Sequence, residues 1–147
     1  MTDITIYTAG EIHSGWRDAL RAALEARGVG AEMVGPQEDH ARSDDVGAAI
    51  LGERPGPRYR DLEGARVNTL RTRVLLARAE LVVAYFGPEY KQWNTAVDVG
   101  WALASGLPVL LVRAAELVHA LKELDALVSL TVETLEEAAD AIAYIFE

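Results

Sequence analysis

Two carboxylates follow the ends of two apolar segments that read as buried strands. Glu11 comes just after residues 3–9, and Asp98 comes after residues 81–86 and a short polar loop. An ionised carboxylate can attack an anomeric carbon and form a glycosyl-enzyme, while a second carboxyl group handles the proton of the leaving or attacking group. We therefore predict Asp98 as a nucleophile and Glu11 as its proton-transferring partner.

Residues that could hold a substrate surround both carboxylates in the sequence. Aromatic rings can stack on a nucleobase, and a tyrosine can also bind a sugar hydroxyl. His13 has a second interpretation, as part of the start of the first helix. The predicted substrate-binding residues near the two carboxylates are Tyr7, Gly10, His13, Gly87, Tyr90, Trp93 and Asn94.

Each carboxylate also has a structural interpretation. We place Asp98 in the first turn of a helix that starts at the pair Asn94-Thr95. The helix dipole favours a negative charge there and would keep the carboxylate ionised, and such residues are frequent for helix stability alone. Glu11, after the end of a strand, could simply be solvated.

Strand and helix patterns alternate along the chain and must position these residues. β-Branched and apolar runs predict five strands, at residues 3–9, 31–34, 80–86, 108–112 and 126–132. Helical spacing and capping residues predict helices at residues 14–27, 62–79, 94–105 and 114–124, with Ser14 as a cap of the first and Thr134 as the cap of a final one.

Such alternation predicts a single α/β domain over residues 1–147, a doubly wound parallel sheet with helices on both faces. Right-handed crossovers and five strands favour the flavodoxin-like order 2-1-3-4-5. In that order the topological switch lies between the first and third strands. Ligands bind at such a point, so Glu11 and Asp98 are expected in one crevice.

Residues 36–62 interrupt the pattern and are predicted to be mainly an irregular loop, with a short helix at 46–51 as an option. Long irregular stretches in compact domains are usually functional. We expect this loop to close over the crevice and supply Asp44 or Asp45 to sugar hydroxyls. His40 with Asp39 and the same two aspartates could also be a metal cluster, but their spacing matches no metal motif, and we predict no metal.

The composition excludes several classes of protein. The net charge is −9 and there is no cysteine, which disfavours nucleic-acid binding and excludes disulfides or a thiol nucleophile. No apolar run approaches the roughly 20 residues of a membrane span. The N-terminus enters a strand pattern at once, so we expect a cytoplasmic protein.

The charge is uneven, at −1 up to Arg78 and −8 from Ala79 onward. Residues 54–78 hold seven arginines against two acidic residues. This cluster could meet a phosphate or a carboxylate, or it could be a solvated helix face that pairs with acidic residues. For Arg71 and Arg73 the two options are a 5′-phosphate and the acidic residues of a neighbouring subunit.

Cofactor motifs are missing at the loops where such a fold would carry them. No GxGxxG follows a strand, and no GxxxxGK[ST] occurs. Glu11 would repel the phosphate of a flavin, and the first and third strands lack the acidic residues of a receiver domain. We therefore predict no cofactor.

Two sets of motifs resemble known families. Tyr7-Thr8-Ala9-Gly10, the segment NTAVDVG from Asn94 and the later Gly106-x-Pro108 resemble nucleoside 2-deoxyribosyltransferases and their deoxynucleotide N-hydrolase relatives. Nearly the whole chain is more specifically similar to the YtoQ family, through AGEIHSGWR, DHARSDDVGAAILG, NTLRTR, YKQWNTAVDVGWA and VHALKE.

The resemblance implies an enzyme acting on the N-glycosidic bond of a nucleoside or nucleotide, by transfer or by hydrolysis. It places Asp98 at the nucleophile position and Tyr7 in the pocket wall. It also implies a homodimer or larger assembly in which a neighbour completes the pocket. Apolar faces around Trp101 and Leu103 and along residues 66–78 could form that interface.

Three differences from the transferase pattern support a second hypothesis. The nucleophile position holds Asp98 in place of a longer glutamate, and Asn94 replaces a glycine. The acidic residue expected before that glycine is absent, since residues 90–93 read YKQW. The alternative is a non-catalytic sensor that binds a nucleotide or nucleoside on the same fold.

Overall fold

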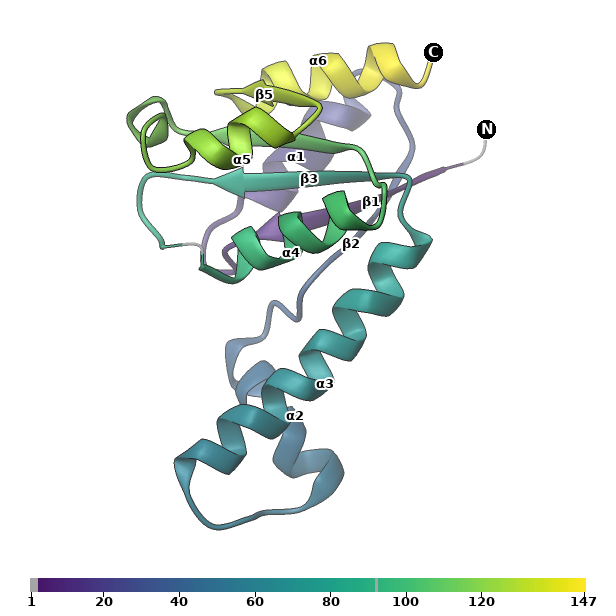
Figure 1. Cartoon of the computed structure of the whole chain (residues 1–147). Coiled ribbons are helices and arrows are strands. Elements are labelled where there is room, and N and C mark those ends of the chain that lie inside the picture. Colours follow the sequence, from purple (N-terminus) through teal and green to yellow (C-terminus); the bar gives the residue numbers. More distant parts are fainter. Residues whose placement is uncertain (1–2, 92) are drawn as a thin grey trace.

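A five-stranded parallel sheet forms the centre of the molecule in the computed structural model, which describes residues 3–91 and 93–147 (Figure 1). The strand order is β2-β1-β3-β4-β5, which confirms the predicted topology. The strands are β1 Ile4–Gly10, β2 Ala31–Val34, β3 Leu81–Phe86, β4 Val109–Arg113 and β5 Leu130–Val132.

Helices lie on both faces of this sheet. They are α1 Trp16–Glu25, α2 His40–Leu51, α3 Pro57–Arg78, α4 Trp93–Ala104, α5 Lys122–Leu127 and α6 Leu135–Ile145, with a 3-10 turn at Ala115–Leu117. Helices α1 and α6 share one apolar core with the sheet, while α4 and the end of α3 share the other. None of the described helices is long and apolar enough to cross a membrane.

The central strands are buried on both sides, as expected for a parallel sheet covered by helices. Val83 and Leu110 point into the core under α1 and α6, whereas Val82 and Leu111 point into the core under α4. This explains why β3 and β4 read as continuous apolar runs. The carboxyl ends of β1 and β3 lie side by side, with Gly10 opposite Tyr85. The switch point is therefore where the sequence predicts it.

Helix α2 and the first half of α3 project away from the sheet as a helical hairpin (Figure 1). Only Gly47 of α2 is buried, and it packs against α3 so closely that a Cβ there would lie 2.6 Å from the backbone nitrogen of Gly64. The two helices can therefore cross at close range. The end of α3 returns to the sheet through Leu76.

The prediction of a mainly irregular segment at 36–62 is wrong. Helix α2 fills most of it, and α3 begins at Pro57. Asp39 caps α2 by accepting a hydrogen bond from the backbone N–H of Arg42 at 3.0 Å. Since these helices bury few apolar side chains, the segment lacks the apolar periodicity from which a helix is predicted.

Helix starts account for the other differences. Ser14 does not cap α1, which begins at Trp16 after an uncapped Gly15. Helix α4 begins at Trp93, so Asp98 is its sixth residue and lies beyond the first turn. The helix predicted at 114–124 is replaced by the 3-10 turn and the later α5. Thr134 does cap α6, in a reciprocal capping box with Glu137.

Candidate functional site

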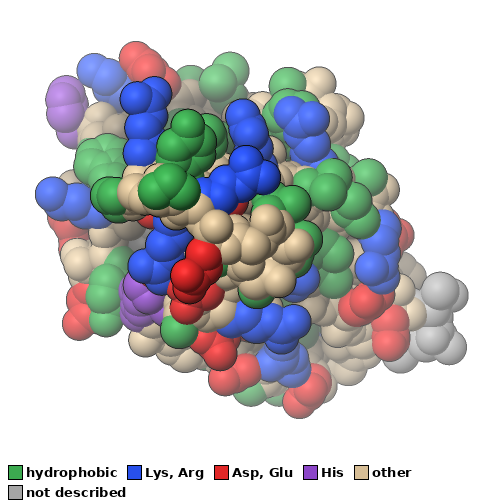
Figure 2. Space-filling model, turned by 90° about the horizontal axis from the view of Figure 1, so that it is seen from below, with side chains coloured by type: hydrophobic (Ala, Val, Ile, Leu, Met, Phe, Trp, Pro, Cys, Tyr) green, Lys and Arg blue, Asp and Glu red, His purple; other side chains and the backbone are tan. Residues whose placement is uncertain are grey.

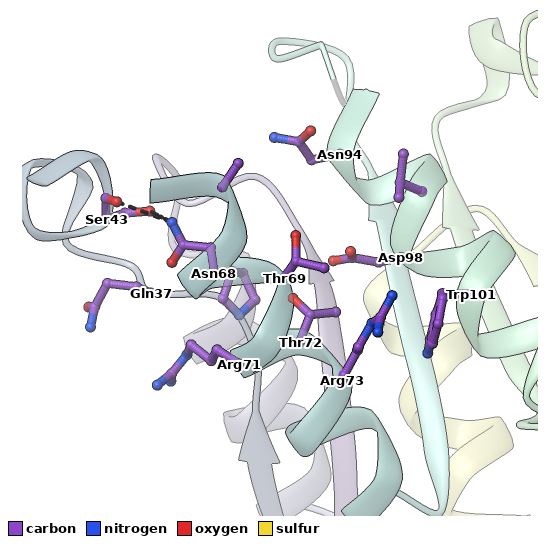
Figure 3. A pocket seen from close by; sticks show the side chains of 13 residues that line it. Gln37, Ser43, Asn68, Thr69, Arg71, Thr72, Arg73, Asn94, Asp98 and Trp101 are labelled. Atoms are coloured by element: carbon purple, nitrogen blue, oxygen red, sulfur yellow. Dashed lines mark hydrogen bonds between the residues drawn. The ribbon is translucent and has the colours of Figure 1, made fainter. Parts of the chain in front are cut away.

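Asp98 lies at the carboxyl edge of the sheet, on the side of α4 that faces β1 and α3 (Figure 3). The Tyr7 hydroxyl donates a hydrogen bond to Asp98 Oδ2 at 3.1 Å. The same hydroxyl lies 3.5 Å from Thr72 Oγ1. The Tyr7 hydroxyl has one proton, which it uses in the hydrogen bond to Asp98. In the contact with Thr72, the Tyr7 oxygen can therefore only accept. Three elements therefore meet at one carboxylate.

Burial raises the pKa of Asp98 to about 6, and the hydrogen bond from Tyr7 opposes this only in part. The expectation that Asp98 lies in the first turn and is stabilised there by the helix dipole is wrong, because the residue lies past that turn. At neutral pH a carboxyl group with a pKa of about 6 is still mostly ionised. The pKa of Tyr7 is raised too, by burial and then by the Asp98 charge. Tyr7 is fully buried and remains a hydrogen-bond donor.

Two hollows meet at Asp98. The first, about 270 Å³, lies between α3 and α4, and we call it the α3–α4 hollow. The second, about 420 Å³, lies between the loop after β1, the start of α2 and the loop before α4, and we call it the β1-loop hollow. Both are also lined by Pro36, Gln37, Ser43 and Asn94. A ligand whose reacting atom sits at Asp98 can thus extend in two directions.

The β1-loop hollow contains most of the predicted site. Its lining includes the predicted residues Gly10, Glu11, His13, Asp44, Tyr90, Trp93, Asn94 and Asp98. The His13 ring lies 5.2 Å from that of Tyr90 and 5.6 Å from that of His40. These rings give the hollow an aromatic wall.

Three predicted residues line neither hollow: Tyr7, Asp45 and Gly87. Tyr7 is fully buried and contacts Asp98 rather than the open space. Asp45 points to Arg60 of α3, with which it forms an ion pair. Gly87 follows β3, and a Cβ there would lie 2.8 Å from the Tyr85 ring. Asp45 and Gly87 therefore have structural contacts where a substrate contact was expected.

Glu11 is held by its own loop. Its carboxylate accepts hydrogen bonds from the backbone N–H of His13 at 2.5 Å and of Ser14 at 2.8 Å, and a further one from the Ser14 hydroxyl. Burial opposes ionisation of Glu11, but these hydrogen bonds outweigh it and lower its pKa. A saturated, ionised carboxylate suits the positioning of the loop. The prediction that Glu11 transfers a proton stays a prediction.

Arg17 fixes the other side of this loop and was missed from the sequence. Its buried guanidinium donates to the backbone oxygens of Thr8, Gly10 and Glu11, at 2.6 to 3.1 Å. Trp16 stacks on Tyr85 and leaves no room for a side chain at Gly10, where a Cβ would lie 2.6 Å from the indole. The segment AGEIHSGWR thus forms one rigid unit.

The α3–α4 hollow was not predicted (Figure 3). Its walls on α3 are polar residues at helical spacing, and Asn68 donates to Ser43 of α2 at 3.1 Å. The motif NTLRTR could have indicated this polar wall, because residues three and four apart lie on the same face of a helix. The hollow is lined on α3 by Ala65, Asn68, Thr69, Arg71, Thr72 and Arg73 and on α4 by Asn94, Val97, Asp98 and Trp101.

The charged residues near the site do not form a metal centre. His40 Nδ1 lies 3.6 Å from Asp44 Oδ2, but no group of three His, Cys, Asp or Glu side chains suited to a metal occurs among residues 3–91 and 93–147. The arginines of α3 are also spread out. Figure 2, from the hairpin end, shows basic side chains interspersed with apolar and acidic ones rather than gathered in one patch.

Comparison with known proteins places the chain in a family. Residues 7–146 match the family described as nucleoside 2-deoxyribosyltransferase YtoQ. The YtoQ protein of Bacillus subtilis (strain 168) is 41% identical over 145 residues, which cover 99% of this chain and 98% of that protein. The chain belongs to the YtoQ family.

Three solved structures share its fold. A conserved protein of Enterococcus faecalis V583 matches with a TM-score of 0.64 and 17% identity, covering 98% of this chain and 99% of that one. The 2-deoxyribosyltransferase of Bacillus psychrosaccharolyticus matches with a TM-score of 0.56 and 15% identity, covering 92% of this chain and 90% of that one. The CMP N-glycosidase of Clostridium botulinum matches with a TM-score of 0.53 and 15% identity, covering 96% of this chain and 98% of that one. The YtoQ fold is thus that of deoxyribosyltransferases and N-glycosidases.

Proposed function

We propose that this YtoQ-family chain breaks the N-glycosidic bond of a nucleoside or nucleotide, with Asp98 as the nucleophile. The observation that carries the proposal is a partly buried carboxylate, held by Tyr7, at the junction of two hollows. The family description names a nucleoside 2-deoxyribosyltransferase, and two proteins of the same fold act on deoxyribosyl groups and CMP.

Asp98 can supply the first half of the reaction. Oδ2 accepts the Tyr7 hydrogen bond, so Oδ1 is the oxygen that attacks the anomeric carbon. The C1′–N bond breaks, its electron pair stays on the base nitrogen, and the sugar is left as an ester of Asp98. The base takes up a proton from water or from a side chain of the β1-loop hollow. His13 and Tyr90 carry exchangeable protons there.

The second half releases the sugar. Water, or the nitrogen of another base, attacks C1′, the C1′–Oδ1 bond breaks, the carboxylate is restored, and the proton of the attacking group passes to solvent water. Water gives a hydrolase, whereas a second base gives a transferase. The aromatic wall of His13, Tyr90 and Trp93 offers stacking surfaces on which one base can replace another. Asp44, at the same hollow, is our candidate for binding a sugar hydroxyl.

Release of free base tests the function. The protein is incubated with 2′-deoxynucleosides and nucleoside 5′-monophosphates, with and without a second base, and the products are separated by chromatography. We expect free base or an exchanged nucleoside from the wild type and none from Asp98→Ala. Full activity in Asp98→Ala would remove the proposed mechanism.

A non-catalytic sensor is the second candidate. It is favoured by the short Asp98 side chain, because an aspartate reaches less far toward a substrate than the glutamate expected at this position. A sensor would be stabilised against heat by nucleosides or nucleotides without turnover. Stabilisation with no product after prolonged incubation would favour the sensor, and turnover would exclude it.

We also propose that the chain forms a homodimer or larger assembly. Apolar side chains are exposed on neighbouring faces of α3 and α4, with Leu70 63%, Val74 53%, Val97 69% and Trp101 43% exposed. Leu103, expected in this interface, instead packs against the core. Light scattering at micromolar concentration measures the mass, and a strictly monomeric value would overturn the proposal.

A further inference from the structure

Arg73 carries a positive charge into the α3–α4 hollow. Its guanidinium lies over the Trp101 ring, 4.3 Å from the centroid, and Figure 3 shows it between α3 and α4 below Asp98. Within the described residues it has no carboxylate at ion-pair distance, and neither have Arg42, Arg58, Arg66 and Arg71, whereas the other seven arginines each have one. Of the five arginines without an ion pair, only Arg71 and Arg73 line this hollow. The Arg73 charge is therefore available to a ligand.

The contact with Trp101 favours a charged guanidinium at this position, because a cation over an aromatic ring is attracted by the electrons of the ring face. The guanidinium carries its N–H groups in a planar fork. That planar fork matches two oxygens of a phosphate. The Trp101 contact also restricts the flexible arginine side chain before any ligand binds, which lowers the entropy lost on binding.

Thr69 lies one helical turn before Arg73 and lines the same hollow. Residues four apart share a helix face, so Thr69 and Arg73 both lie on the side of α3 that faces α4 (Figure 3). Arg71, two residues from Arg73, points away from Asp98 and donates to the Gly35 backbone oxygen at 3.2 Å. Arg73 and Thr69 are thus the anion-binding pair.

The position of Asp98 between the hollows orients the substrate. With C1′ at Asp98, the base and the C5′ side of the sugar extend in opposite directions. The β1-loop hollow has the aromatic rings, and its two carboxylates besides Asp98, Glu11 and Asp44, outnumber its one lysine, Lys91, which disfavours an anion there. The α3–α4 hollow has Arg73 and Thr69. The C5′ substituent therefore enters the α3–α4 hollow.

We infer that Arg73 and Thr69 form a binding site for the 5′-phosphate of a nucleoside monophosphate, which makes nucleotides rather than nucleosides the preferred ligands. This inference rests on the proposed function, because it uses Asp98 as the point where C1′ lies. The overall charge of −9 repels anions, so the local cation is needed to bind a phosphate.

Binding measurements test the inference without requiring turnover. The four 2′-deoxynucleoside 5′-monophosphates and the corresponding 2′-deoxynucleosides are titrated into Asp98→Asn protein by calorimetry, so that no product forms. We expect at least one monophosphate to bind about tenfold or more tightly than its nucleoside. Adding Arg73→Met should lower the affinity for that monophosphate about 10- to 100-fold and change the affinity for the nucleoside by less than about threefold.

Two further variants complete the design. Arg58→Met removes the same charge from the same helix, roughly 22 Å along the axis from Arg73, and should leave both affinities unchanged. Thr69→Val keeps the side-chain shape and should lower the affinity for the monophosphate by about three- to tenfold, with the affinity for the nucleoside unchanged. Equal affinity for nucleoside and monophosphate, a preference that survives Arg73→Met, or an equal loss in Arg58→Met would each overturn the inference.

Failure of the inference is distinguishable from failure of the proposed function. Release of base from nucleosides and monophosphates at equal rates, unaffected by Arg73→Met, supports the function and overturns the phosphate site. A monophosphate preference that depends on Arg73, without release of base by the wild type, supports the phosphate site and overturns the function.

Discussion

Two carboxylates lie at the same hollow in opposite electrostatic environments. Asp98 has one hydrogen-bond donor, Tyr7, and burial raises its pKa to about 6. Glu11 is buried too, but three local donors overcome that burial and lower its pKa. The local backbone decides the difference. The loop after β1 turns its N–H groups onto Glu11, whereas Asp98 lies inside a helix whose N–H groups are already bonded.

The comparison separates a stabilising carboxylate from a reactive one. Glu11 in its ionised form contributes to the stability of the fold. Asp98 costs stability when ionised, because the folded chain solvates it poorly. Perturbed, under-satisfied groups are typical of functional sites. The contrast therefore supports the proposal that Asp98 is the nucleophile and that Glu11 positions the loop.

Replacement of Asp98 by Asn should have the largest effect. Loss of the nucleophile should reduce base release by at least about 10⁴-fold, while Asn keeps an oxygen for the Tyr7 hydrogen bond. The pKa of Asp98 rises from 3.8 to about 6 on folding, so stability falls as pH rises through that window. At pH 7.5 the variant should be more stable by roughly 2 kcal/mol, or about 4–8 °C in Tm.

Chromatography and thermal unfolding measure the two effects of Asp98→Asn, and unfolding repeated at pH 3.5 serves as the control. There Asp98 is protonated in the folded wild type, so the difference in Tm should shrink. A variant less stable than wild type at pH 7.5 would show that Asp98 is not under electrostatic strain.

The pH dependence of the wild type should be the next largest effect. Only ionised Asp98 attacks, so the rate of base release should increase about tenfold per pH unit below 6 and level off above it. At pH 4 the rate should be about 100-fold below the plateau. Circular dichroism at each pH shows whether the chain stays folded. A rate that is flat from pH 4 to 8 would contradict the assignment of Asp98.

Replacement of Tyr7 by Phe should have a moderate effect. The hydrogen bond from Tyr7 holds the pKa of Asp98 down, so its loss should raise the midpoint of the pH profile by about one unit. The ionised fraction of Asp98 at pH 7 would then fall from about nine-tenths to about one half, so the rate should fall about twofold at pH 7 and about tenfold at pH 5. Thr72→Val is the matched control, since it removes only the 3.5 Å contact to the same hydroxyl. An unchanged midpoint in Tyr7→Phe would show that this hydrogen bond does not set the pKa.

Replacement of Glu11 by Gln should have the smallest effect on activity and an effect on stability opposite to that of Asp98→Asn. The stability from a lowered pKa is present at neutral pH and is lost as pH falls below about 4.5. The Gln amide cannot accept all three hydrogen bonds, which should cost about 1–2 kcal/mol at pH 7.5. We expect base release within about tenfold of wild type. A loss of 10²- to 10⁴-fold with unchanged stability would instead establish Glu11 as the proton-transferring partner.

The sequence by itself determined the sheet and the place of the candidate site at its switch point. Continuous apolar runs mark β3 and β4 because parallel strands are buried on both faces, and alternation with helices fixed the order β2-β1-β3-β4-β5. That order brings the ends of β1 and β3 together, and with them Glu11 and Asp98. These features depend on local patterns and on the chirality of the chain.

Only the tertiary structure decided the helical hairpin, the second hollow and the charge states. Helices α2 and α3 cross where Gly47 meets Gly64, two residues that are 17 apart in the sequence. A contact between glycines adds no apolar side chains, so the helices show no apolar periodicity from which they could be predicted. The α3–α4 hollow exists because α3 returns to the sheet beside α4. The pKa of Asp98 depends on burial under other elements, whereas that of Glu11 depends on how its own loop turns. Solvation and long-range packing are properties of the folded chain, so residue spacing alone could not supply them.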